Sequence, residues 1–213
     1  NYNATNASIS TIHTDFQGMH ADAQIEFKLA KIAPNGQCFN GVTRTFSQLA
    51  EMNGYLDQKV HAVINGNDIY QGNWSEEMYL NIFVCWADVG EATSSNFNGN
   101  SGMVNNSIFI YDPYVGTIGT SAVNTKDFLT TAIGRWLGLQ YTFGPKTFGL
   151  DPNNCFTDDG LSDTPNCVWE YGCNLNSAVC GPRAMVENFM ALSYCMKFFT
   201  NDQVGVMHTT LEN

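Results

Sequence analysis

The sequence lacks any run of about 18 apolar residues, so it offers no helical segment able to span a membrane. Basic residues are also scarce, because nine Lys and Arg stand against 20 Asp and Glu and give a formal net charge of −11. Such a chain repels phosphates, which argues against a nucleic-acid partner. Hydrophobic residues make up 44% and charged residues 14% of the 213 residues, a composition typical of one folded domain with a sizeable core.

Several catalytic motifs are missing as well. The chain has no H-E-x-x-H zinc motif, no G-x-S-x-G nucleophile elbow and no Cys–His pair that can be placed together. Its four histidines contain no i, i+4 pair and are interpreted as surface or loop residues: His13, His20, His61 and His208. A hydrolase of another class is therefore only a secondary hypothesis.

The seven cysteines include five between Cys155 and Cys195, in a segment rich in Gly, Asn, Asp and Pro. None forms a Cys-x-x-Cys pair, so disulfides in an oxidising compartment are a better interpretation than a zinc ribbon. An odd total leaves at least one thiol free or cross-linked to another chain. The opening Asn1-Tyr2-Asn3, without Met or a leader, is typical of a processed mature chain. Four N-x-S/T sequons are relevant only in a eukaryotic host, and they begin at Asn3, Asn6, Asn73 and Asn105.

Hydrophobic periodicity predicts strands in the first half of the chain. Residues 24–30 alternate apolar and polar side chains, as in a half-buried strand. Residues 78–86 are almost continuously apolar, which is typical of a strand buried on both faces. Residues 107–111 predict another strand. The sequence therefore predicts an α/β (α+β) fold once the helices that follow are included.

Two helices are expected in the second half. From about residue 125, apolar residues recur at helical spacing up to Leu137, and Gly138 is expected to end that helix. A second helix is expected over about residues 200–211. The segment between them is rich in loops and cysteines.

The segment 131–143 (TAIGRWLGLQYTF) resembles the zinc helix of the pappalysin-like (ulilysin-type) metzincin metalloproteases. That family carries H-E-x-x-H-x-x-G-x-x-H, and the packing residues of the motif are present here: Gly134, Trp136, Leu137, Gly138, Leu139, Thr142 and Phe143. Residues 25–45 resemble the family's first core strand, and 79–85 its central strand. Asn188-Phe189-Met190 resembles the Met-turn, and Phe199-Thr200 with Gln203 resembles the start of the closing helix.

The resemblance covers about residues 10–210 and implies a metzincin-like zincin fold, with a twisted mixed sheet and an irregular, disulfide-stapled C-terminal part. One domain over residues 1–213 is expected. Its upper subdomain, of sheet and helix, would span about 1–141, and its lower subdomain about 142–213.

The resemblance places unsuitable residues at the positions that carry the chemistry. Family members hold zinc with three imidazoles, and a Glu takes a proton from the zinc-bound water. In that frame Thr131, Arg135 and Tyr141 stand for the three histidines, Ala132 for the Glu, and Leu192 for a Tyr after the Met-turn. Arginine stays protonated and offers only donors, and one phenol does not make a zinc site. We therefore expect no bound zinc and no family-type catalysis.

Two further site hypotheses concern the loop-rich segment. Asp158, Asp159 and Asp163 resemble the loop after the zinc helix, and they fit either a structural calcium site or a solvated turn held by Asx-type hydrogen bonds. The resemblance also implies the disulfides Cys155–Cys180 and Cys173–Cys195. The state of the three other cysteines is left open: Cys38, Cys85 and Cys167.

These observations favour a secreted, non-catalytic pseudo-metalloprotease. It would serve as a protein-binding or structural subunit of an extracellular or cell-surface assembly, such as an adhesin complex or filament. Its partner would be another protein or a second copy of the chain, bound over an interface of roughly 1,000 Å² or more. One alternative is a secreted decoy or inhibitor that binds the substrates or partners of an active protease. The other is a divergent active hydrolase, whose turnover would be insensitive to a zinc chelator.

Overall fold

The computed structural model describes residues 9–44, 74–85, 101–104, 106–116, 127–144, 155–170 and 172–212. The chain forms two compact units: residues 1–24 together with 123–213, and residues 25–122. This division differs from the expected boundary near residue 141. The predicted zinc-type helix, α3 (Phe128–Trp136), belongs with the C-terminal segment because its side chains contact that segment directly.

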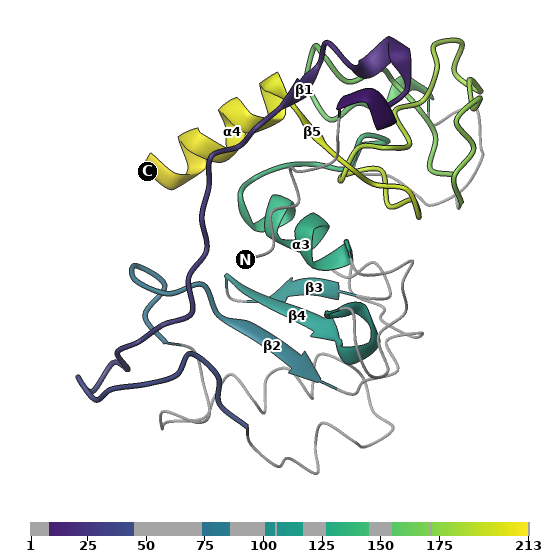
Figure 1. Ribbon diagram of the computed structural model, residues 1–213. Coiled ribbons are helices and arrows are strands. Elements are labelled where there is room, and N and C mark those ends of the chain that lie inside the picture. The colour runs from purple at the N-terminus through teal and green to yellow at the C-terminus, as the bar shows by residue number, and fades with distance from the viewer. Residues whose placement is uncertain are drawn as a thin grey trace. The chain divides into compact units, whose positions relative to one another are not determined.

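The unit of residues 25–122 contains a mixed three-stranded sheet (Figure 1). Its strands are β2 (Ile82–Cys85), β3 (Ser101–Val104) and β4 (Ser107–Tyr111), in the order β2-β4-β3. Strand β2 runs parallel to β4, and β3 runs antiparallel to it. The first four residues of β4 are buried, and a 3-10 helix, η3 (Asp112–Tyr114), follows the strand. The strand predicted over residues 107–111 is thus confirmed, and it is the middle one of these three.

The prediction for residues 78–86 was only partly right. The strand covers residues 82–85, and the side chains of Ile82 and Val84 are 38% and 49% exposed, so it is not buried on both faces. Phe83 points the other way and stacks on Phe109 of β4, with the ring centroids 4.7 Å apart. An apolar run shows that a strand is hydrophobic, but it does not show that a second layer covers each face.

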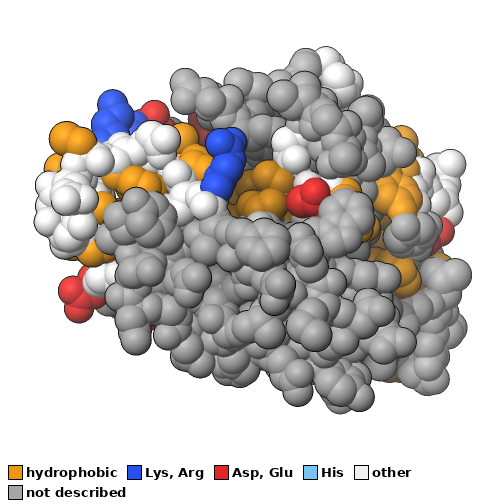
Figure 2. Space-filling view, turned by 90° about the horizontal axis from the view of Figure 1, so that it is seen from below, with side chains coloured by type: hydrophobic (Ala, Val, Ile, Leu, Met, Phe, Trp, Pro, Cys, Tyr) orange, Lys and Arg blue, Asp and Glu red, His pale blue; other side chains and the backbone are white. Residues whose placement is uncertain are grey.

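The strand predicted over residues 24–30 was wrong, because this described segment joins no sheet. Phe27 and Leu29 are 47% and 65% exposed, and Lys28 pairs with Glu26 at the surface. Alternating apolar and polar side chains form a strand only where a neighbouring strand supplies the backbone hydrogen bonds. Figure 2 shows hydrophobic side chains of described residues at the molecular surface, with few Lys or Arg side chains near them.

The other unit joins the two ends of the chain. Two 3-10 helices, η1 (Ile9–Thr11) and η2 (Thr14–Phe16), precede β1 (His20–Ala21), which pairs antiparallel with β5 (Phe199–Thr200). In Figure 1 this pair lies next to the start of α4 (Asn201–Glu212). A buried cluster links early and late segments, and it consists of Ile12, Phe16, Met185 and Phe198.

The helix predicted over residues 200–211 is confirmed, and its first turn explains where it starts. Thr200 and Gln203 form a capping box: the Thr200 hydroxyl accepts the Gln203 N–H at 3.3 Å, and Gln203 Oε1 accepts the Thr200 N–H at 3.0 Å. The Asp163 carboxylate accepts from the Thr200 hydroxyl at 2.7 Å and from the Asp202 N–H at 2.9 Å. An acid at this end of a helix also complements the helix dipole.

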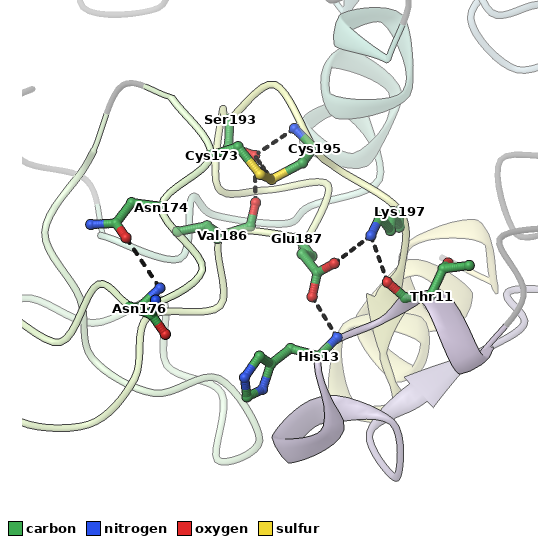
Figure 3. Close-up of a disulfide and its surroundings, with 10 residues drawn as sticks. All are labelled: Thr11, His13, Cys173, Asn174, Asn176, Val186, Glu187, Ser193, Cys195 and Lys197. Carbon is green, nitrogen blue, oxygen red and sulfur yellow. Dashed lines mark hydrogen bonds and ion pairs between the residues drawn. A yellow bond between two sulfur atoms is a disulfide. The ribbon is translucent and has the colours of Figure 1, made fainter.

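A buried carboxylate fixes the N-terminal segment (Figure 3). Glu187 is 1% exposed; its Oε2 accepts the His13 N–H at 2.7 Å, and its Oε1 pairs with Lys197 Nζ at 2.5 Å. The same Nζ donates to the Thr11 carbonyl at 2.6 Å. Each charge of this pair is therefore satisfied by hydrogen bonds, as burial requires.

The irregular segment carries two disulfides, Cys155–Cys180 and Cys173–Cys195, with Cα–Cα distances of 5.3 and 5.7 Å. These are the pairs that the resemblance implies. The second bond lies beside Ser193, whose hydroxyl accepts the Cys195 N–H at 3.2 Å and donates to the Val186 carbonyl (Figure 3). Disulfides form and persist in oxidising compartments. Within the described part of the chain, no helix is long and apolar enough to cross a membrane.

We predict that removing the second disulfide, by Cys173→Ala with Cys195→Ala, lowers the free energy of unfolding by about 3 kcal/mol. The bond joins residues 22 apart, and the loss of loop-closure entropy sets this magnitude. Denaturant unfolding measures it. Cys38→Ala is the matched control, since Cys38 is an exposed free thiol and its loss should leave the midpoint unchanged. Equal midpoints for the double variant and the unmodified protein would contradict the prediction.

Candidate functional site

Helix α3 rests on the turn at residues 188–190, at very short range. A Cβ added to Gly134 would lie 2.7 Å from the Met190 sulfur and 3.4 Å from both Leu139 Cδ1 and Phe199 Cε1. Met190 is completely buried, and its carbonyl accepts the Thr142 N–H at 3.2 Å. The helix therefore needs glycine at position 134 so that the turn can pack beneath it.

The turn itself is held by paired carboxamides. Asn188 Nδ2 donates to Gln203 Oε1 at 2.8 Å, and Gln203 Nε2 donates to Asn188 Oδ1 at 3.1 Å. Asn188 Oδ1 also accepts the Met190 N–H at 2.8 Å. Both carboxamides are fully buried, so each of these hydrogen bonds satisfies a polar group that would otherwise lack a partner. The start of α4 thus fixes the turn that supports α3.

The first two positions of the motif, 131 and 132, are built into this packing. Thr131 is fully buried, and its hydroxyl donates to the Phe189 carbonyl at 2.6 Å and lies 3.5 Å from the Met196 sulfur. Ala132 is 4% exposed. The hydroxyl at position 131 therefore ties the helix to the turn and is already occupied by a protein acceptor.

The other two positions of the motif contact each other. Gly138 has φ +88°, a left-handed conformation that ends the helix and bends the chain. Beyond the bend, the Tyr141 ring lies under the Arg135 guanidinium, with Cζ 4.8 Å from the ring centroid. Arg135 Nη1 donates to the Leu139 carbonyl at 2.9 Å and to Gln140 Oε1 at 2.8 Å. Arg135 therefore holds the post-helix segment against the helix end.

Leu192, where the resemblance expects a Tyr, is 5% exposed and has φ +54°. A branched side chain rarely adopts this left-handed conformation, so the surrounding turn must impose it. Leu192 offers no polar group for chemistry. Its side chain is part of the buried hydrophobic core.

The side chains at these positions do not fit a zinc ion. Thr131 and Arg135 donate their protons to protein acceptors, and a guanidinium offers a metal no lone pair. Among the described residues, no three His, Cys, Asp or Glu side chains form a metal-binding group. His208 lies near the Ala23 carbonyl, with its Nε2 2.8 Å from that oxygen, and His13 Nδ1 accepts the Asp15 N–H. His61 lies outside the described residues.

The three aspartates of the calcium hypothesis have different partners. Asp158 accepts the Gly160 N–H at 3.0 Å, as in an Asx turn. One Asp159 oxygen, Oδ1, accepts from the Leu161 N–H at 3.1 Å and from the Thr164 hydroxyl at 2.6 Å. Asp163 is engaged at the start of α4. The calcium site stays a prediction. The hydrogen bonds that Asp158 and Asp159 accept are of the kind expected if this loop is a turn held by Asx-type bonds.

Asp159 is electrostatically unusual. The pKa of its carboxyl is raised from 3.8 to about 6, first by burial and also by the neighbouring Asp158, while the hydrogen bonds from Thr164 and Leu161 lower it. Its second oxygen is buried and has no hydrogen-bond partner among the described residues. Folding therefore favours the protonated form of this side chain.

The remaining cysteines differ in exposure. Cys38 is an exposed free thiol, whereas Cys167 is buried, and its sulfur lies 3.6 Å from the Thr142 hydroxyl. Burial raises the pKa of the Cys167 thiol to about 11, so it is not a nucleophile at neutral pH. The side chain of Cys85 lies outside the described residues.

The helix, the glycine bend and the buried methionine turn together are the arrangement of a metzincin-like zincin fold. Solved structures agree. Mature mirolysin of Tannerella forsythia in complex with a cleaved peptide superimposes with a TM-score of 0.73 at 24% identity, over 98% of this chain and 78% of that one. A mutant of Tannerella forsythia promirolysin gives 0.73 and 24%, over 97% and 68%. These likenesses establish the fold.

The family follows from the sequence. The model of the peptidase family described as pregnancy-associated plasma protein-A matches residues 64–212, which is more than half of the chain. The chain belongs to this pappalysin family, as the resemblance indicated. No curated protein matches it significantly.

We predict opposite effects for alanine at two helical glycines. Gly134→Ala should destabilise the protein by about 1–3 kcal/mol, because the new Cβ overlaps the buried Met190 sulfur. Gly205→Ala, in α4 with nothing within 4 Å of the added Cβ, should be neutral or stabilise by up to about 1 kcal/mol. Denaturant midpoints compare the two. If Gly134→Ala proves as stable as Gly205→Ala, the proposed packing of α3 on the turn is wrong.

We predict that Asp159→Asn stabilises the protein near neutral pH. The folded-state pKa lies above the unfolded one, so wild-type stability falls as pH rises from the ordinary value of 3.8 towards about 6. Asparagine keeps Oδ1 for its two donors and removes the ionisable group. The advantage of the variant should therefore vanish in acid, as measured by thermal unfolding across pH in EDTA.

The control for this prediction is Asp163→Asn. Both Asp163 oxygens accept hydrogen bonds, so this variant should lose stability at neutral pH. Repeating the series with Ca²⁺ tests the calcium hypothesis: a calcium site would stabilise the wild type when the ion is added, and Asp159→Asn would abolish that gain. A destabilised Asp159→Asn variant in EDTA at neutral pH would contradict the electrostatic argument.

Proposed function

We propose that this chain is a non-catalytic member of the pappalysin family that acts by binding another protein. The observation that supports it most is the bonding at the motif positions. Thr131 bonds to the Phe189 carbonyl, and Arg135 bonds to Leu139 and Gln140 and packs on Tyr141. Zinc hydrolysis needs neutral imidazoles and a nearby general base, and these side chains provide neither.

The retained packing supports a role that needs the fold without the chemistry. Gly134, Gly138 and Met190 preserve the close approach of helix and turn. Protein binding fits such a fold, because it needs complementarity of the surface and not a reactive metal.

An extracellular setting is part of the proposal. The two disulfides fit an oxidising compartment, and the net charge of −11 fits a soluble chain that avoids nucleic acids. We favour a subunit or accessory of a secreted or cell-surface assembly, bound to a protein partner or to a second copy. A secreted decoy is the second candidate, since Arg135 leaves part of its guanidinium available at the former site.

We predict that the purified protein, dialysed against buffer with trace zinc, holds far less than one zinc per chain and cleaves no peptide in a chelator-sensitive manner. Elemental analysis and mass spectrometry of an incubated peptide mixture measure both. The positive control is the combined variant Thr131→His, Ala132→Glu, Arg135→His and Tyr141→His, which rebuilds the ligand set on the same helix. About one zinc per unmodified chain, together with peptide cleavage, would overturn the proposed function.

A further inference from the structure

The guanidinium of Arg135 is held on one side only. Both hydrogen bonds that fix it come from Nη1, to the Leu139 carbonyl and to Gln140 Oε1. The Tyr141 ring supports one face of the group, and that ring in turn stacks on Phe143 with centroids 5.0 Å apart and planes 8° apart. The guanidinium therefore has a fixed plane and a fixed orientation, and its side chain is only partly buried.

The opposite edge, formed by Nε and Nη2, has donors left over. Within the described part of the chain, neither nitrogen has a hydrogen-bond acceptor and no carboxylate pairs with Arg135. Two other described cations of the same unit are paired, Arg183 with Asp15 and Lys197 with Glu187. The chain has more than twice as many acidic as basic residues, yet the protein holds Arg135 in place without pairing it to a described acid. Arg135 differs in this respect from a surface cation that belongs to a local ion pair.

We propose that the Nε–Nη2 edge of Arg135 binds a carboxylate of a protein partner, supplied by a chain terminus or by an Asp or Glu side chain. This inference rests on the proposed non-catalytic binding function and assigns its contact to the former zinc helix. Two parallel N–H donors in one plane match the two oxygens of a carboxylate. Because the protein itself holds the guanidinium in place, little side-chain entropy is lost on binding.

The ligand class follows from the charge. A guanidinium edge can pair with a carboxylate or with a phosphate, but the net charge of −11 repels a phosphate or another polyanion more strongly than a single carboxylate. A single carboxylate on an otherwise neutral peptide needs only two donors. Gln140, whose Oε1 accepts from Arg135 Nη1, is exposed and carries an amide NH2 group as a further donor.

The test is an NMR titration of the Arg135 Nε–H resonance, which is assigned by its absence in Arg135→Lys. Three probes are used: acetyl-Ala-Asp-Ala-amide, acetyl-Ala-Ala-Ala with a free C-terminus, and the neutral acetyl-Ala-Asn-Ala-amide. We expect saturable shifts with a Kd of about 1–10 mM for at least one carboxylate peptide, and none for the neutral peptide. The two carboxylate probes show whether a side chain or a chain terminus is preferred.

The variants separate binding from a purely structural role of Arg135. Arg135→Lys keeps the charge but loses the planar fork. The Kd for the carboxylate peptides, read from their shifts at the Gln140 backbone amide, should therefore rise by about tenfold or more. Lys28→Gln, which removes one exposed positive charge elsewhere, should leave wild-type affinity. Unchanged affinity in Arg135→Lys, equal shifts with the neutral peptide, or no shift with any probe would overturn the inference and leave the proposed function standing. Cleavage of a probe, seen by mass spectrometry, would overturn both.

Discussion

The close contact between helix α3 and the Met190 turn is the constraint on which the rest of this site depends. Gly134 lies where even one added carbon would meet the Met190 sulfur at 2.7 Å. Position 134 therefore cannot change without moving either the helix or the turn. The turn is itself fixed by the reciprocal Asn188–Gln203 carboxamide bonds, so the position of α3 depends on the first turn of α4.

Under the proposed non-catalytic function, this constraint explains why the chain keeps the packing residues of a zinc helix while the ligand positions differ. In active metzincins, the metal links the helix to the segment beyond the glycine bend. Here the Arg135 cation, the Tyr141 ring and the Leu139 carbonyl make contacts that link the same two segments. A cation–π contact contributes about 0.5–1 kcal/mol, and a hydrogen bond from a charged donor contributes about 1.5–3 kcal/mol where it is shielded from water. A few such contacts are enough to hold the bend, although they do not supply a reactive water.

Much of this arrangement could be predicted from the sequence, and the failures have physical causes. The helix ending at Gly138 and the helix starting at Thr200 carry local signals, namely a glycine stop and a Thr-x-x-Gln capping box. Exposure of β2 depends on what covers its faces, and no periodicity within the strand records that. The Glu187 carboxylate was missed because its partner at His13 is 174 residues away. Only the fold brings those two segments together.

The bonding of the residues at the motif positions also bears on how readily a zinc site could form on this helix. A histidine at position 131 would leave the buried Phe189 carbonyl without its hydroxyl donor, and an unsatisfied buried acceptor costs about 1–3 kcal/mol. Replacing Arg135 would remove its two hydrogen bonds and its contact with Tyr141 at once. Each single step back towards a zinc site therefore weakens the fold before a metal can compensate, since one imidazole alone holds zinc poorly. Such coupling favours keeping the present side chains and using them for another purpose, for which a fixed, partly exposed guanidinium is suited.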